Sequence, residues 1–388
     1  MNRFIAAAVA GLLAGPALAA DPGVTDTEIK IGDVNIMTGP ASFIGRAVSI
    51  GSKIAAAEIN EAGGVKDRMI TIITEDDGYG PARSLQALTK LIEVDEIFAL
   101  NGTSGTANIL AMMPLIEENN LPTIVTTAPN ELVYDPVRPS VFTIGASYSD
   151  AFFAQLKYVH DNMNIENPVY GLIRQDDDFG VAVEHGYDRA VEEFGVKDGG
   201  RVAFKKGTSN FAAEMAQMNQ AGVNVLANGG IIAGAANILS EARKLGMDLQ
   251  STNVWSEDMP LSVNLAAEAG YDYLVADYVA LTGEANDAFL EKAKKYVTED
   301  EIAAMNRYTY VTYAGLSVLA EAMKQCGDDL TRACTIEKLA AMKDFDTGGI
   351  TAPISFDNEK QLSGTALAVY QLDAETKTFS ALTDFVDY

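Results

Sequence analysis

The chain has few residues that carry metal or nucleophilic chemistry, with two histidines and two cysteines among 388 residues. His160 and His185 stand far from each other and from the cysteines, so the clustered ligands of a zinc site are missing. The acidic stretch "QDDDFG" at residues 175–180 lacks the spacing of a calcium-binding loop. We therefore expect no bound metal, and we expect both histidines to be surface or packing residues.

Nucleotide-binding and nucleophile motifs are also missing. The sequence contains no G-x-x-x-x-G-K-[ST] loop, and Gly229, Gly230 and Gly234 fit no dinucleotide fingerprint. Ser104 lacks the G-x-S-x-G frame of a serine hydrolase. These absences predict that the chain is not an enzyme and uses no cofactor.

Positive charge is scarce, because 28 Lys and Arg residues stand against 54 Asp and Glu residues, for a net charge of −26. Binding to nucleic acid or to an anionic membrane surface depends on clusters of Lys and Arg. The sequence contains no such cluster. The composition therefore argues against both partners.

Residues 1–20 have the features of an export signal. They contain one basic residue, Arg3, then an apolar core, and then Ala17 and Ala19 in an A-x-A arrangement. We expect cleavage after Ala19. The other long uncharged stretch, residues 223–239, is too short and too polar to span a membrane, and its pattern predicts a buried strand, a glycine turn and a helix. The mature protein is therefore expected to be exported.

The two cysteines lie close together, in "KQCGDDLTRACTIEK". In an oxidising compartment, a pair separated by a short Gly-Asp-Asp loop favours a disulfide. We predict that Cys326 and Cys334 are bonded, with a stabilisation of about 2–3 kcal/mol because the closed loop is small.

Short β-branched runs alternate with helical patterns along most of the chain. A first series of predicted strands covers residues 29–36, 69–76, 97–100 and 122–127. A second series covers residues 168–175, 201–208, 223–230, 252–257 and 273–280. Such alternation predicts an α/β fold with parallel sheets covered by helices, in two units. After the second unit we expect helices over 286–299 and 306–325, a strand over 352–360, and a terminal hairpin that turns at "DAETK".

Two hydroxyl-rich loops follow neighbouring predicted strands of the first unit. The loop "NGTSGT" carries Thr103, Ser104 and Thr106, and "VTTAPN" carries Thr126 and Thr127. A helix start offers free backbone N–H groups and a positive dipole end, so such a loop can bind a carboxylate without a lysine. The alternative, in which the hydroxyls only cap a helix, stays open.

Two loops of the second unit offer complementary groups. Phe179 follows a predicted strand, where its ring could cover a ligand or could pack inside its own lobe. Glu257, in "VWSED", could hold an ammonium group or could cap a helix. Hydroxyl loops and an acid from two different sheets are what a zwitterion bridging a cleft would require.

The stretches "IKIGDVNIMTGPASFIGRAVSIGSKIAAAEINEAGGV" and "MITIITEDDGYGPARS" together resemble a known family. This family comprises the periplasmic solute-binding proteins of branched-chain amino acid ABC transporters, of the leucine/isoleucine/valine-binding type. The resemblance extends across nearly the whole mature chain. It rests on residues 37–40, Gly45, residues 59–64, and Asp76 and Asp77 with Pro81.

The resemblance implies a type I periplasmic binding fold, with two Rossmann-like lobes, three crossovers and a ligand cleft between the lobes. The implied crossovers fall near residues 145–148, 278–283 and 351–354. The implied N-terminal lobe is residues 21–147 plus 283–352, and the C-terminal lobe is residues 148–282 plus 353–388, after a signal peptide at residues 1–20.

The resemblance also implies the binding residues. The two hydroxyl loops would hold an α-carboxylate, Phe179 would cover the ligand, and Glu257 would receive an α-ammonium. The full implied set is Phe43, Ile44, Thr103, Ser104, Thr126, Thr127, Ala128, Tyr148, Phe179, Ile231 and Glu257. The sequence departs from the family at Ile231 and Ile232, which replace an expected aromatic, and it lacks the family's usual disulfide near the first acidic strand end.

Residues and resemblance together predict a periplasmic, monomeric binding component that delivers a small carboxylate-bearing solute to an inner-membrane ABC permease. The expected ligand is a branched-chain or other apolar amino acid. The alternatives are a binding protein for an aromatic acid or for a short amide or urea, a sensory binding protein, and a secreted serine hydrolase that uses Ser104.

Overall fold

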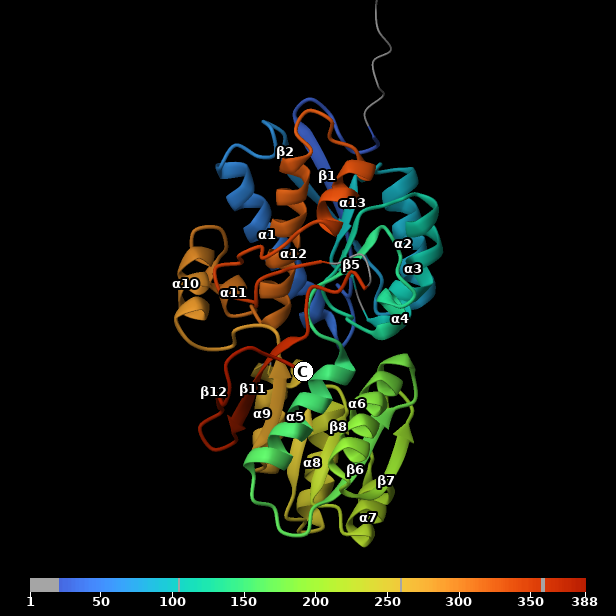
Figure 1. The fold of residues 1–388 in the computed structure, drawn as a ribbon, viewed down its shortest axis with the longest axis vertical. Helices are drawn as coiled ribbons and strands as arrows, with labels where there is room; N and C mark the ends of the chain where they lie inside the picture. Colours follow the sequence, from blue (N-terminus) through green and yellow to red (C-terminus); the bar gives the residue numbers. More distant parts are fainter. Residues whose placement is uncertain (1–20, 104, 259, 357–359) are drawn as a thin grey trace, which may run out of the picture.

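The computed structural model describes residues 21–103, 105–258, 260–356 and 360–388, without the side chains of residues 257, 258, 260 and 261. The expected signal segment, residues 1–20, lies outside the described residues. The chain forms two α/β lobes, one above the other in Figure 1. The expected two-unit α/β architecture is therefore confirmed.

The first lobe contains a five-stranded parallel sheet in the order β2-β1-β3-β4-β5. Its strands are β1 (Glu28–Asn35), β2 (Met69–Asp76), β3 (Ala99–Asn101), β4 (Thr123–Val125) and β5 (Val141–Thr143). The helices between and after these strands are α1 (Ser42–Glu61), α2 (Pro81–Glu93), α3 (Thr106–Glu118), α4 (Glu131–Tyr134), α10 (Glu284–Ala293), α11 (Glu299–Ile302), α12 (Arg307–Gln325) and α13 (Arg332–Ala340).

Alternation along β1 explains how helices cover both faces of this sheet, because successive side chains of a strand point to opposite faces. Ile31 belongs to a buried cluster with Ile54 of α1. Val34 belongs to a different cluster, with Leu88 of α2 and Ile109 of α3. Accordingly, α1 packs against α12, and α2 packs against α3.

The second lobe contains an eight-stranded sheet in the order β12-β11-β10-β9-β8-β6-β7, with β13 paired to β11. Its strands are β6 (Val169–Gln175), β7 (Lys197–Phe204), β8 (Val225–Gly229), β9 (Gln250–Asn253), β10 (Tyr273–Asp277), β11 (Ala366–Asp373), β12 (Thr378–Ala381) and β13 (Val386–Asp387). Its helices are α5 (Tyr148–Asn162), α6 (Asp178–Phe194), α7 (Ala212–Ala221), α8 (Ala233–Lys244), the 3₁₀ turn η1 (Trp255–Asp258) and α9 (Pro260–Ala269). In the described part of this sheet, β11 pairs antiparallel with β10, β12 and β13, and the other strand pairs are parallel.

The chain passes between the sheets at three neighbouring places. Gly145, between β5 and α5, donates its backbone N–H to Ser363 Oγ at 2.7 Å. Val279, after β10, forms a bridge with Thr351. Gly145 adopts φ +92°, and an added Cβ would lie 2.2 Å from the Tyr278 ring, so only glycine fits where the first crossing meets the second.

Several predicted elements differ from the structure. The helix expected over 286–299 ends earlier, because α10 stops at Ala293 and the separate helix α11 begins only at Glu299. The strand expected over 252–257 ends at Asn253, and η1 begins at Trp255. The strand expected over 352–360 is wrong for the described residues, which make only an isolated bridge between Ile354 and Phe345. The sequence patterns did not predict the short strand β5.

The predicted disulfide is confirmed. Cys326 ends α12 and Cys334 lies in α13, and their Cα atoms are 5.9 Å apart with the sulfurs bonded. The bond therefore joins two consecutive helices of the first lobe.

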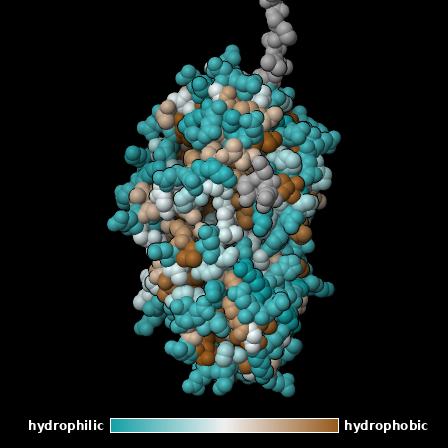
Figure 2. Space-filling view, in the orientation of Figure 1, coloured by the Kyte–Doolittle hydropathy of each residue, from teal (hydrophilic) through white to brown (hydrophobic). Residues whose placement is uncertain are grey.

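The surface is mainly hydrophilic on the face in Figure 2, where hydrophobic residues are scattered among hydrophilic ones. Among the described residues, no helix combines the length and the apolar composition needed to cross a membrane.

Candidate ligand-binding cleft

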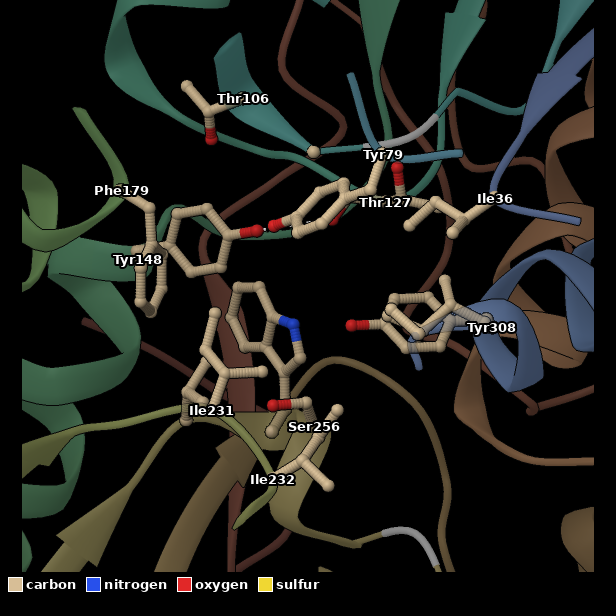
Figure 3. Close-up of a pocket in the computed structure, with 15 residues that line it drawn as sticks. Ile36, Tyr79, Thr106, Thr127, Tyr148, Phe179, Ile231, Ile232, Ser256 and Tyr308 are labelled. Atoms are coloured by element: carbon tan, nitrogen blue, oxygen red, sulfur yellow. Dashed lines mark hydrogen bonds between the residues drawn. The ribbon is translucent and has the colours of Figure 1, made fainter. Parts of the chain in front are cut away.

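A cavity lies where the carboxyl ends of the two sheets face each other, the usual place for ligands in open α/β sheets (Figure 3). The first lobe contributes Ile36, Ile44, Tyr79, Thr106, Thr127 and Tyr308. The second contributes Phe179, Ile231, Ile232, Val254, Trp255 and Ser256, and Tyr148 stands at the first crossing. The space for the centres of water-sized molecules is about 60 Å³, several times the roughly 10–15 Å³ that one water needs. In this arrangement of the lobes the cavity therefore has room for a few water-sized molecules, and a larger organic ligand would enter it only with the lobes further apart.

Aromatic side chains form much of the wall. The Tyr148 ring stacks on Trp255, with centroids 4.7 Å apart, and meets Phe179 edge to face at 4.8 Å. In Figure 3 the hydroxyls of Tyr79 and Tyr148 point toward each other, and the hydroxyl of Tyr308 points into the cavity. Burial raises the pKa of Tyr79 to about 12 and that of Tyr148 well above its usual value, so both phenols stay neutral.

The hydroxyl loops form the opposite side. Thr127 lines the cavity and donates its hydroxyl to the Thr103 carbonyl, and the hydroxyls of the two residues lie 3.4 Å apart. Its own carbonyl accepts the Tyr148 hydroxyl at 3.1 Å. Thr106 is the first residue of α3, so its side chain stands at the positive end of a helix of 13 residues.

Two buried donors on the cavity wall have no hydrogen-bond partner among the described residues. They are the Thr106 hydroxyl and the Trp255 indole N–H, and they come from opposite lobes. An unpaired buried donor costs about 1–3 kcal/mol. Acceptor groups of a ligand placed in the cavity would remove these penalties, so the cavity is suited to a ligand with acceptor oxygens, such as a carboxylate.

A buried ion pair stands behind the wall. The Asp277 carboxylate accepts hydrogen bonds from Arg307, whose guanidinium lies 4.9 Å from the centre of the Trp255 ring. Burial alone would lower the pKa of Arg307, but the Asp277 carboxylate outweighs it and holds that pKa well above its usual range. Arg307 therefore remains charged.

The structure brings five of the eleven residues expected to bind ligand onto the cavity wall. These are Ile44, Thr127, Tyr148, Phe179 and Ile231.

Four other expected residues stand away from the wall. Thr103 is fully buried and contacts Thr127, whereas the Thr126 hydroxyl lies 3.3 Å from that of Thr312 on α12. Ala128 belongs to the core between the first sheet and α2–α3, and Phe43 packs beside Ile44. The remaining two lie outside the description: Ser104 entirely, and Glu257 beyond its backbone in η1.

Ten of the fifteen residues that line the cavity are absent from the expected binding set. Ile36 directly follows β1 and Tyr79 follows β2, so a search of every predicted strand end would have found both. Tyr308 lies in the first turn of α12 and reaches the cavity only because α12 packs against α1. No local pattern marks such a residue.

Comparison with known proteins gives consistent results. A family model described as "Periplasmic binding protein" matches residues 28–377. The leucine-specific-binding protein of Salmonella typhimurium is 24% identical over 385 residues, covering 97% of this chain and 98% of the relative.

Two solved structures share the fold. A branched chain amino acid ABC transporter protein from Thermus thermophilus, with bound valine, has a TM-score of 0.82 and 19% identity, covering 94% of this chain and 98% of that chain. A solute binding protein from R. palustris, in complex with 4-hydroxybenzoate, has a TM-score of 0.80 and 17% identity, covering 93% of this chain and 97% of that chain. The described fold is therefore the type I periplasmic binding fold.

Proposed function

The chain belongs to the periplasmic binding protein family, and on this premise we propose that it captures a small carboxylate with an apolar side chain for an ABC importer. The observation that carries the proposal is the pair of unpartnered donors, Thr106 and Trp255, on opposite sides of an otherwise largely apolar cavity. A bound carboxylate would pair with one of these donors, and a ligand that reaches both lobes would favour contact between them.

An apolar amino acid is the ligand that we favour. The aliphatic wall of Ile36, Ile44 and Ile231 suits a branched side chain. We assign the ligand ammonium to Glu257, whose backbone lies in η1 directly after Ser256. The names of the relatives support this choice, because the Salmonella protein is called leucine-specific and the Thermus structure contains valine.

An aromatic acid is the second candidate. The rings of Tyr79, Tyr148, Phe179, Trp255 and Tyr308 all line the cavity. Ring faces and edges can hold a flat aromatic ligand, and the R. palustris relative was solved with 4-hydroxybenzoate.

In this proposal the mature protein works in the periplasm as a monomer, after removal of residues 1–20. The lobes are residues 21–147 plus 283–352 and residues 148–282 plus 353–388. They close on the ligand by bending at the crossings, and the permease recognises the closed form.

A ligand screen tests the proposal. The protein is unfolded and refolded to remove copurified ligand, and its melting is measured with apolar amino acids, aromatic acids and amides. A ligand at one hundred times its Kd should stabilise the fold by about 2.7 kcal/mol. Stabilisation by leucine or valine supports the first candidate, and stabilisation by 4-hydroxybenzoate alone supports the second. If no carboxylate stabilises the protein, the proposal is wrong, and ester or amide turnover that Ser104→Ala abolishes would point to a hydrolase instead.

A further inference from the structure

Asp277 and Arg307 form a fully buried ion pair between the lobes. Asp277 is the last residue of β10 in the second sheet, and Arg307 is the first residue of α12, which packs on the first sheet. Arg307 Nε donates to Asp277 Oδ2 at 2.5 Å and Nη2 donates to Oδ1 at 2.8 Å, with both side chains completely buried. Burying two charges costs solvation energy, and apolar replacements of such a pair are often as stable. Stability alone is therefore a weak reason for this pair.

Three aromatic rings surround the Arg307 guanidinium. Its central carbon lies 4.8 Å from the centre of the Tyr278 ring and 4.9 Å from those of Trp255 and Tyr308. A cation on a ring face favours particular ring orientations. Because Trp255 and Tyr308 line the ligand cavity, the ion pair lies directly behind the wall that a ligand would touch.

Trp255 connects the ion pair to the ligand site. One neighbour, Tyr148, stacks on the indole at 4.7 Å, and another, Tyr278, meets it edge to face at 5.3 Å. The indole N–H is buried and has no hydrogen-bond partner in the part of the chain that the structure describes. Its direction is thus determined by rings and by the guanidinium rather than by a hydrogen bond.

We propose that the Asp277–Arg307 pair is a positioning element of the ligand site. It holds the Trp255 and Tyr308 rings so that the indole N–H is presented to the ligand, and it increases affinity without touching the ligand. This inference rests on the proposed binding role of the cavity.

Two variants separate positioning from simple stabilisation. Arg307→Met leaves the Asp277 carboxylate unpaired and should lower the melting temperature strongly. The double variant Arg307→Met/Asp277→Leu removes both charges and should recover most of that loss. It should still bind the ligand at least about tenfold more weakly, the loss expected when a hydrogen bond to a charged group is misplaced.

The experiment measures melting temperature, Kd for leucine, valine and 4-hydroxybenzoate, and the emission of Trp255, the only tryptophan. The proposal predicts a double variant with recovered melting, a shifted Trp255 emission and weakened binding. A double variant with wild-type Kd and wild-type emission would overturn it. If that variant does not fold, Arg307→Lys replaces it, because lysine keeps the charge but loses the planar contact with the rings and should shift the emission and weaken binding in the same way.

A second buried arginine provides the control. Arg332 donates to the backbone carbonyls of Phe98, Ile97 and Asn119 and does not line the cavity. Arg332→Met should lower the melting temperature but leave the Trp255 emission and Kd unchanged. The Trp255 emission of the variants can be compared in the ligand-free protein. This comparison therefore tests the positioning role even if none of the three probes binds and the proposed function is wrong.

Discussion

The ammonium group of Lys206 lies 3.2 Å from the centre of the Tyr79 ring, and the two residues belong to opposite lobes. Lys206 follows β7 in the second lobe, and Tyr79 follows β2 in the first. Tyr79 lines the ligand cavity, and its ring packs so closely on Gly105 that an added Cβ there would lie 2.5 Å from it. The ring is thus held between the start of α3 and the lysine of the other lobe.

The first prediction is that Lys206 slows ligand release. Lys206→Met removes the cation–π contact, which is worth about 0.5–1 kcal/mol at an exposed site, so the ligand should dissociate roughly twofold to fivefold faster in stopped-flow measurements. Lys205→Met is the matched control, because Lys205 is the exposed neighbour and makes no such ring contact with any described residue. Slower association with unchanged dissociation would contradict the prediction and would indicate electrostatic steering alone.

The Thr106 hydroxyl should increase the affinity for a carboxylate ligand and should lower the stability of the ligand-free fold. Thr106→Val removes a buried donor that has no partner among the described residues, so the ligand-free protein should melt at the same or a higher temperature. Carboxylate binding should weaken by about tenfold or more, the loss of a hydrogen bond to a charged group. Calorimetric titration of Thr106→Val beside Thr106→Ser, which keeps the hydroxyl, checks this, and equal affinities would exclude a contact with the ligand.

These residues show which parts of the site local sequence can predict. Strands and strand-end loops follow from periodicity and turn chemistry over a few residues, so the predicted strand at 29–36 lies within one residue of β1 (Glu28–Asn35) and the hydroxyl loops border the cavity. Tyr308 and Arg307 begin a helix nearly two hundred residues after those loops. Their place at the cavity depends on how α12 packs on α1 and meets β10 across the crossings, and no short pattern encodes that arrangement.

Asp33 should make the fold less stable as the pH rises. It is fully buried in β1, and burial raises its pKa well above the usual 3.8, although the Thr74 side chain opposes the shift. Between 3.8 and the raised folded value, the native state holds a proton that the unfolded chain has released, so stability falls as pH increases through that window. Asp33→Asn should therefore raise the melting temperature at pH 7.5 and have little effect below pH 4. An equal gain at both pH values would contradict a titrating Asp33.

Asp76 should behave in the opposite way. Burial alone would raise its pKa, but hydrogen bonds from Thr38, Gly78 and Met37 lower it to about 2. Its stabilising contribution should be complete above the usual 3.8 and should be lost as pH falls toward 2. Asp76→Asn should lower the melting temperature at pH 7. At pH 2.5 the difference in melting temperature between the variant and the wild type should be smaller. If the melting-temperature difference between variant and wild type were the same at pH 7 and pH 2.5, the stabilisation by these hydrogen bonds would not depend on the charge of Asp76.

The Cys326–Cys334 bond should stabilise the fold without affecting ligand binding. The bond closes a sequence separation of eight residues, for which loop entropy predicts about 2–3 kcal/mol. Neither cysteine lines the cavity, and Arg332 still ties α13 to the backbone of the first lobe after the bond is lost. The double variant Cys326→Ala/Cys334→Ala should therefore melt at a lower temperature with unchanged Kd, and a reductant should reproduce the shift in the wild type but not in the variant. A weakened Kd in the double variant would show that α12, which carries Arg307 and Tyr308 at its other end, transmits the loss to the cavity.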